Sequence, residues 1–144
     1  MGIDTMGRVT AEALIENLED QTLAEASKLA KSEIRRLIVP NALVDTGASS
    51  LSMPIGMIQH LGLKLHRKRR TITAGGSREV GVYSAVRLTI QERDCIVEVN
   101  ELPDECPVVI GQIPLEAMDW VVDPNGQCLI GNPAHGGEWT IEQY

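Results

Sequence analysis

Short apolar segments, separated by glycine, proline and polar residues, recur along the chain from residue 34 onward. Segments with this punctuation are typical of β-strands. The pattern predicts strands at 34–44, 71–73, 80–83, 85–90, 95–99 and 108–110, and a strand running into a turn at 121–126. It also predicts two short helices, one at 54–61 that ends at Gly62 and one at 114–120. We therefore expect a mostly-β domain with one or two short helices.

Residues 74–77 read Ala-Gly-Gly-Ser and lie between two of the predicted strands. Paired glycines reach the positive φ angles that a tight turn needs. This segment is therefore expected to be the turn of a β-hairpin.

The first 35 residues give two conflicting signals. Residues 11–31 are rich in alanine, leucine, glutamate and lysine, which are good helix formers. Apolar residues at 9, 11, 13 and 15, however, follow the two-residue period of a strand, and 17–20 could be a turn between two strands. The residues alone leave this choice open.

Length and composition exclude several classes of protein. The chain has 144 residues, which suits a single domain spanning 1–144, and a net charge of −7, which argues against a general nucleic-acid binder. No apolar run approaches the roughly 18–20 residues that a membrane span needs. The first residues have neither the basic start nor the apolar core of a signal peptide, so we expect a cytoplasmic protein. Phenylalanine is absent and aromatic residues make up only 3%, so the core must be aliphatic.

The cysteines and histidines show no metal-binding spacing, and no metal or other cofactor is expected. The cysteines are odd in number and widely separated, as reduced thiols of a cytosolic protein would be. The residues concerned are Cys95, Cys106, Cys128, His60, His66 and His135.

One basic run, residues 64–70, stands out in this acidic chain. It could contact nucleic acid or an acidic partner. The net negative charge favours the simpler interpretation, a solvated surface loop.

The most distinctive segment is 42–51, in which three apolar residues are followed at once by Asp45, Thr46 and Gly47. A carboxylate at the end of a buried strand is expected to be partly shielded from water, which raises a carboxyl pKa and makes an acid or base candidate. Thr46 can fix the loop by hydrogen bonding, and Gly47 allows a sharp turn. Because aspartate and glycine also favour ordinary turns, the motif alone is weak.

In its context, the segment resembles the active-site loop of the retropepsin-like aspartic peptidases, over residues 43–49. Two further matches follow in the order of that family. Residues 74–77 look like the tip of its flap (about 71–83), and 108–111 with 114–118 look like its second apolar strand, closing glycine and helix (108–120). The resemblance covers about residues 34–133.

This resemblance implies an all-β fold, a small closed β-barrel with one or two short helices that acts as a homodimer. It also implies that residues 7–40 form strands despite their helical propensity. The family uses two facing carboxyl groups, and this sequence has one Asp-Thr/Ser-Gly motif, so the second carboxylate must come from another copy.

The implied activity is that of an aspartic endopeptidase, which hydrolyses a polypeptide with an activated water molecule and needs no metal or cofactor. The catalytic residues would be Asp45, Thr46 and Gly47. The substrate-binding residues would be Ala48, Ser49, Ala74, Gly75, Gly76 and Ser77.

The sequence departs from the retroviral pattern at three positions. Ser49, Ser50 and Gln112 stand where those proteases often carry acidic residues and an arginine. The substitution of neutral residues leaves the catalytic motif intact but bears on dimer strength and substrate polarity. Two alternatives remain: a catalytically silent peptide-binding or dimerisation module on the same fold, and an unrelated β domain in which Asp45 belongs to a turn.

Overall fold

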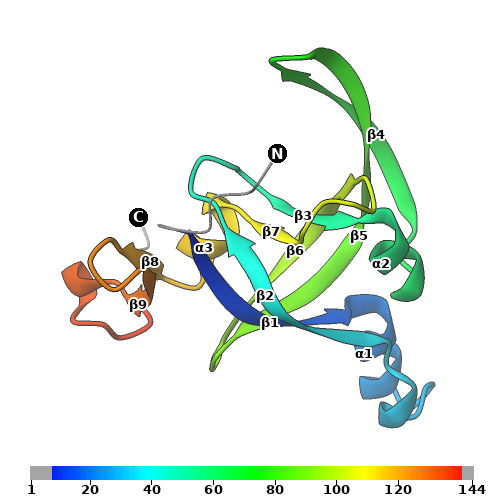
Figure 1. Ribbon diagram of the computed structural model, residues 1–144. Helices are drawn as coiled ribbons and strands as arrows, with labels where there is room; N and C mark the ends of the chain where they lie inside the picture. Colours follow the sequence, from blue (N-terminus) through cyan, green and yellow to red (C-terminus); the bar gives the residue numbers. More distant parts are fainter. Residues whose placement is uncertain (1–7, 141–144) are drawn as a thin grey trace, which may run out of the picture.

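A computed structural model describes residues 8–140, which form nine strands and three short α-helices (Figure 1). The strands are β1 (Val9–Asn17), β2 (Arg36–Val44), β3 (Leu51–Pro54), β4 (Leu65–Thr73), β5 (Gly76–Ile90), β6 (Arg93–Leu102), β7 (Val109–Ile110), β8 (Trp120–Asp123) and β9 (Cys128–Gly131). The helices are α1 (Leu18–Glu25), α2 (Ile55–His60) and α3 (Gln112–Ala117), with single 3₁₀ turns at Lys31–Glu33 and Pro133–His135. The prediction of a mostly-β domain is confirmed.

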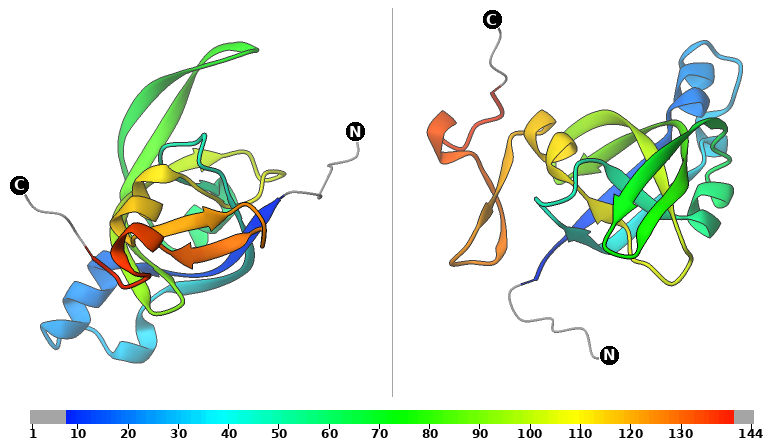
Figure 2. Two further views of the ribbon diagram at one scale, coloured as in Figure 1. Left: turned by 90° about the vertical axis from the view of Figure 1, so that its left-hand side faces the viewer. Right: turned by 90° about the horizontal axis from the view of Figure 1, so that it is seen from above.

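Seven of the strands form one sheet in the order β1-β2-β7-β3-β6-β5-β4. β1 also pairs with β5, so β1, β2, β7, β3, β6 and β5 form a continuous ring of hydrogen-bonded strands, and β4 is attached to β5 outside this ring. The β2–β7 and β3–β6 pairs are parallel, and the other pairs are antiparallel. β8 and β9 form a separate two-stranded sheet beside this body (Figure 2).

The expectation that residues 7–40 are all strand is wrong between β1 and β2, where α1 and a 3₁₀ turn intervene; residue 7 itself lies outside the described residues. The Asn17 side chain caps α1 by accepting a hydrogen bond from the Asp20 amide (3.0 Å), and it donates another to the Leu61 carbonyl (2.7 Å). The Asp20 carboxylate then binds the backbone and guanidinium of Arg35, each at 2.9 Å. These hydrogen bonds fix both ends of the helical segment, the second of them at Arg35, one residue before β2 begins.

Within residues 11–31, helix propensity predicts the structure correctly only where it does not conflict with the pattern of buried side chains. In β1, alternate side chains such as Ala13 and Ile15 are fully buried, so the strand period decides the structure there. α2 ends before Gly62, whose φ is +66°, and the hairpin turn predicted at 74–77 lies at residues 74–75, between β4 and β5. The strands predicted at 80–83 and 85–90 form one continuous strand, β5. The basic run 64–70 is exposed as expected, but it lies in β4 from residue 65 onward and is not a loop. α3 begins two residues before the predicted start at 114.

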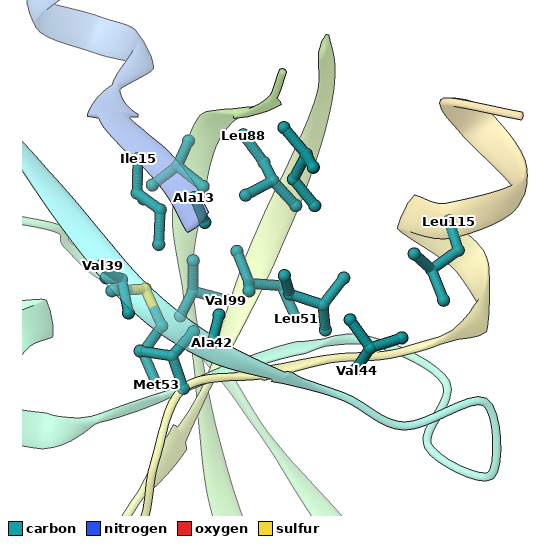
Figure 3. Close-up of a cluster of buried hydrophobic side chains, with 14 of the residues drawn as sticks. Ala13, Ile15, Val39, Ala42, Val44, Leu51, Met53, Leu88, Val99 and Leu115 are labelled. Atoms are coloured by element: carbon teal, nitrogen blue, oxygen red, sulfur yellow. The ribbon is translucent and has the colours of Figure 1, made fainter. Parts of the chain in front are cut away.

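The core is almost entirely aliphatic, as the lack of phenylalanine predicts, and Trp120 is the aromatic side chain buried within it. Side chains from the strands and from α3 meet inside the sheet, among them Ile15, Met53, Leu88, Val99 and Leu115 (Figure 3). Each of these five is at most 1% exposed. Over residues 8–140, no helix is long and apolar enough to cross a membrane.

The β4–β5 hairpin projects from the body as an arm (Figures 1 and 2). The loop that joins β2 to β3 lies on the same side of the molecule in both figures. The fold therefore places the loop and the hairpin tip, which the sequence separates by more than twenty residues, on one side of the molecule.

Candidate active site

The loop between β2 and β3 carries Asp45 and is aimed by the strand beside it. Ala42 and Val44 are buried in β2, and Asp45 follows as the first residue beyond the strand. Its amide donates to the Ile110 carbonyl of β7 (3.0 Å), and the Leu43 amide donates to the Val108 carbonyl (2.8 Å). The backbone on which the Asp45 side chain stands is therefore fixed by the core.

The rest of this loop is held by the start of α3. The amides of Gly111, Gln112 and Ile113 donate to the carbonyls of Ser50 (2.9 Å), Ala48 (2.8 Å) and Ser49 (3.0 Å). The first amides of a helix have no partner within the helix, so here the loop supplies their acceptors.

Gly111 is the position at which loop and helix come closest. A Cβ atom added there would lie 2.6 Å from the Ser50 carbonyl oxygen and 2.7 Å from that of Ala48. Both neighbours are backbone atoms and cannot rotate away. The closing glycine of the second apolar segment thus allows the loop to pack against the helix, a role the sequence did not reveal.

The Asp45 carboxylate itself is exposed, so the expectation that it is partly shielded is wrong for the single chain. Burial ends with Val44 because nothing in the described part of the chain covers the loop. Oδ1 accepts a hydrogen bond from the Gly47 amide (2.9 Å), and a Cβ atom at Gly47 would lie 3.1 Å from that oxygen. The structure shows no other hydrogen bond to this carboxylate from residues 8–140, so Oδ2 remains open.

The other predicted site residues lie in two places, the Asp45 loop and the tip of the β4–β5 hairpin. Thr46 and Ser49 are exposed and Ala48 is half-buried, all within the same loop. A hollow of about 370 Å³ adjoins Asp45 and Thr46, and Arg8 and Val122 are among its other lining residues. The four predicted flap residues lie at the exposed tip of the hairpin, on the same side of the molecule as the loop (Figure 1).

Comparison of the sequence with known families agrees with this geometry. The sequence model of a family described as aspartyl protease matches residues 37–134, more than half of the chain. The chain belongs to the aspartyl protease family. The matched range contains the Asp45 loop, the hairpin and Gly111, which confirms the resemblance to aspartic peptidases. No curated protein matched the chain in a sequence search.

In this aspartyl protease family member, a second hollow connects the loop with the hairpin. It has a volume of about 230 Å³ and lies at the base of the hairpin; we call it the hairpin hollow. Its walls come from the loop and β3, from β4 and β5, from β6, and from α3. They are formed by Ser50, Leu51, Arg67, Arg69, Val82, Val97, Glu98, Asn100, Ile113 and Pro114.

Glu98 is the acidic residue of the hairpin hollow. Its two carboxylate oxygens accept from the two terminal nitrogens of Arg67, each at 2.8 Å, and His66 lies 3.3 Å away. The Arg67 hydrogen bonds, with a smaller contribution from His66, outweigh partial burial and lower the pKa of Glu98 to about 2. The sequence showed only a basic run here, and nothing in it pointed to Glu98.

Proposed function

We propose that this protein is an aspartic endopeptidase that acts as a homodimer, with the catalytic dyad formed by Asp45 of each copy. The family match supports a protease-type hydrolase. The observation that carries the finer proposal is the open Asp45 carboxylate, exposed at the surface on a loop whose backbone is fixed on both sides. A surface carboxylate on so rigid a support is suited to meet a second one.

The chemistry requires that second carboxylate. Two carboxyl groups about 3 Å apart cannot both ionise easily, so the pair retains one proton. The ionised group removes a proton from the attacking water, and the protonated group donates a hydrogen bond to the carbonyl oxygen of the scissile bond. The titration belongs to the pair as a whole.

A second copy would also supply what the single chain lacks around Asp45. It would cover the exposed carboxylate and shield it from water. Thr46, exposed beside it, would brace the two loops through its hydroxyl group. Gly47 would leave room for the backbone of the substrate.

The substrate would be an extended polypeptide held beneath the hairpin. Ala48 and Ser49 would bind its backbone from the loop, and Ala74, Gly75, Gly76 and Ser77 would close over it from the hairpin tip. The three cysteines form no disulfide, which fits action in the reducing cytoplasm.

The experiment compares the wild type with Asp45→Asn on a random-sequence peptide library, read by mass spectrometry. We expect Asp45→Asn to lower cleavage at least about 10³-fold, since it removes the general acid and base. Circular dichroism and sedimentation should show an unchanged fold and an unchanged dimer. Cleavage that survives in Asp45→Asn would refute the dyad, and peptide binding without any cleavage by the wild type would favour the silent binding module.

A further inference from the structure

One face of the β4–β5 hairpin is directed toward the hairpin hollow. Directly opposite residues of an antiparallel pair point to the same side. Arg67 pairs with Val82 and Arg69 with Val80, and both arginines and Val82 line the hollow. Lys68 and Arg70 alternate with them and therefore lie on the opposite face of the hairpin.

The charges of the hairpin hollow do not balance. Arg67 is engaged by both oxygens of Glu98, so this pair neutralises itself. Arg69 makes no hydrogen bond or ion pair in the part of the chain that the structure describes, and it is exposed. The hollow thus holds two guanidinium groups and one carboxylate.

No other acidic side chain of the hairpin compensates Arg69. Glu79 pairs across the strands with Arg70, which places it on the opposite face. Arg78, opposite Thr71, stands on the same face as Arg69 and adds positive charge toward the tip. This cationic face contrasts with the net charge of −7 of the whole chain.

We propose that the hairpin hollow is a substrate subsite that takes an aspartate or glutamate side chain, bound by Arg69. This inference rests on the proposed endopeptidase function and names its substrate class: acidic polypeptides. A guanidinium binds a carboxylate through two parallel hydrogen bonds, which fixes the position of the side chain as well as its charge.

The volume of the hollow agrees with this assignment. Pockets for drug-sized ligands enclose about 300–1,000 Å³. The hairpin hollow, at about 230 Å³, is suited to one side chain of an extended peptide. Its walls include Ser50 of the Asp45 loop and Ile113, whose amide binds that loop, so the bound side chain would occupy a fixed position relative to the cleaved bond.

The test uses the same random-sequence peptide library in two arms. In the first arm, the wild type and Arg69→Gln digest the library, and the cleaved sequences are aligned on the scissile bond. In the second arm, intact peptides are captured on immobilised Asp45→Asn protein, with and without Arg69→Gln. Arg70→Gln is the matched control, because it removes the same charge from the same strand on the opposite face.

We expect Asp and Glu to be enriched about tenfold at one position in both arms, as for a charge-assisted hydrogen bond at a partly open site. Arg69→Gln should abolish the enrichment, Arg70→Gln should retain it, and Arg69→Glu should shift it to Lys and Arg. Enrichment that is absent, or equally affected by the two Gln variants, would overturn the subsite.

The two arms also separate this inference from the proposed function. Acidic capture that depends on Arg69, without Asp45-dependent cleavage, would support the subsite and refute the endopeptidase. Asp45-dependent cleavage without a preference for acidic residues would support the endopeptidase and refute the subsite. Tighter Arg69-dependent binding of a single-stranded oligonucleotide than of the captured peptides would overturn the assignment to polypeptides.

Discussion

Asp45 and Asp119 both lie at strand ends, but the structure holds them in opposite ways. Asp45 follows β2, is exposed, and accepts one hydrogen bond, from the Gly47 amide. Asp119 precedes β8, and its side chain is only 7% exposed. Its Oδ2 binds His135 Nδ1 (2.7 Å) and the Thr140 amide (3.2 Å), while Oδ1 accepts from Asn132 (3.2 Å).

The difference shows what each carboxylate does for the fold. The Asp119 carboxylate gathers three donors from the C-terminal segment, so it stabilises the local structure. The loop of Asp45 is instead held by backbone hydrogen bonds and by the close approach to Gly111. A carboxylate that the fold does not need for its own stability is free for chemistry.

The largest expected loss of stability comes from Gly111→Ala, which disturbs the packing of α3 against the Asp45 loop and leaves the carboxylate intact. The added Cβ would meet backbone atoms at 2.6 Å, and relieving this overpacking costs about 3 kcal/mol. Urea unfolding should show this loss, and peptide cleavage should fall as the loop shifts.

The matched control is Gly56→Ala. There the added Cβ would lie 3.0 Å from a side-chain oxygen of Asp104, which can move aside. We expect a much smaller loss of stability. Equal losses in the two variants would mean that the Asp45 loop does not depend on its contact with Gly111.

The next effect comes from making the same substitution at both aspartates. In Asp119→Asn, whichever way the amide turns, its NH₂ group faces a donor, and a buried unsatisfied group of this kind costs about 2 kcal/mol. In Asp45→Asn, the exposed side chain keeps an oxygen for the Gly47 amide, and we expect a change within about 0.5 kcal/mol.

Both free energies of unfolding can be measured by urea titration on the same day and in the same buffer. The comparison fails if Asp45→Asn proves as destabilising as Asp119→Asn. That result would make Asp45 a structural residue and would weaken the case for its chemistry.

The sequence predicted the parts of the site that are contiguous in the chain. The Asp45 loop and the hairpin turn at 74–77 could be recognised because each depends on neighbouring residues. Arg69 and Glu98 could not be linked from sequence, since they come to line the same hollow only through the pairing of β4, β5 and β6. The exposure of Asp45 was also unpredictable, because the order of residues does not say what covers a strand end.

The helix α1 shows a different limit. Local propensity indicated a helix, and the family resemblance argued for strands throughout 7–40. The position at which the strand gives way to the helix depends on two side-chain hydrogen bonds: Asn17 donates to the Leu61 carbonyl, and the Asp20 carboxylate accepts from Arg35. Contacts of this kind, 44 and 15 residues apart, decide the boundary between β1 and α1 and cannot be inferred from either signal alone.

The smallest effect concerns pH and sharpens the contrast at Asp119. Burial by itself would raise the pKa of Asp119, but the hydrogen bonds from His135, Thr140 and Asn132 outweigh it and lower the pKa. In the unfolded chain an aspartate titrates near its ordinary value of about 3.9. The ionised group therefore stabilises the fold above about pH 4, and this contribution is lost as the pH falls through the lower, folded-state pKa.

Asp119→Asn removes that contribution at every pH. The difference in free energy of unfolding between wild type and Asp119→Asn, measured in urea, should therefore shrink as the pH is lowered from 6 toward 3. The change should be smaller than the effect of the substitution at neutral pH, because protonation leaves the carboxyl group in place with an oxygen that still accepts. A difference that stays constant over this range would mean that the shape of the side chain, rather than its charge, holds the C-terminal segment.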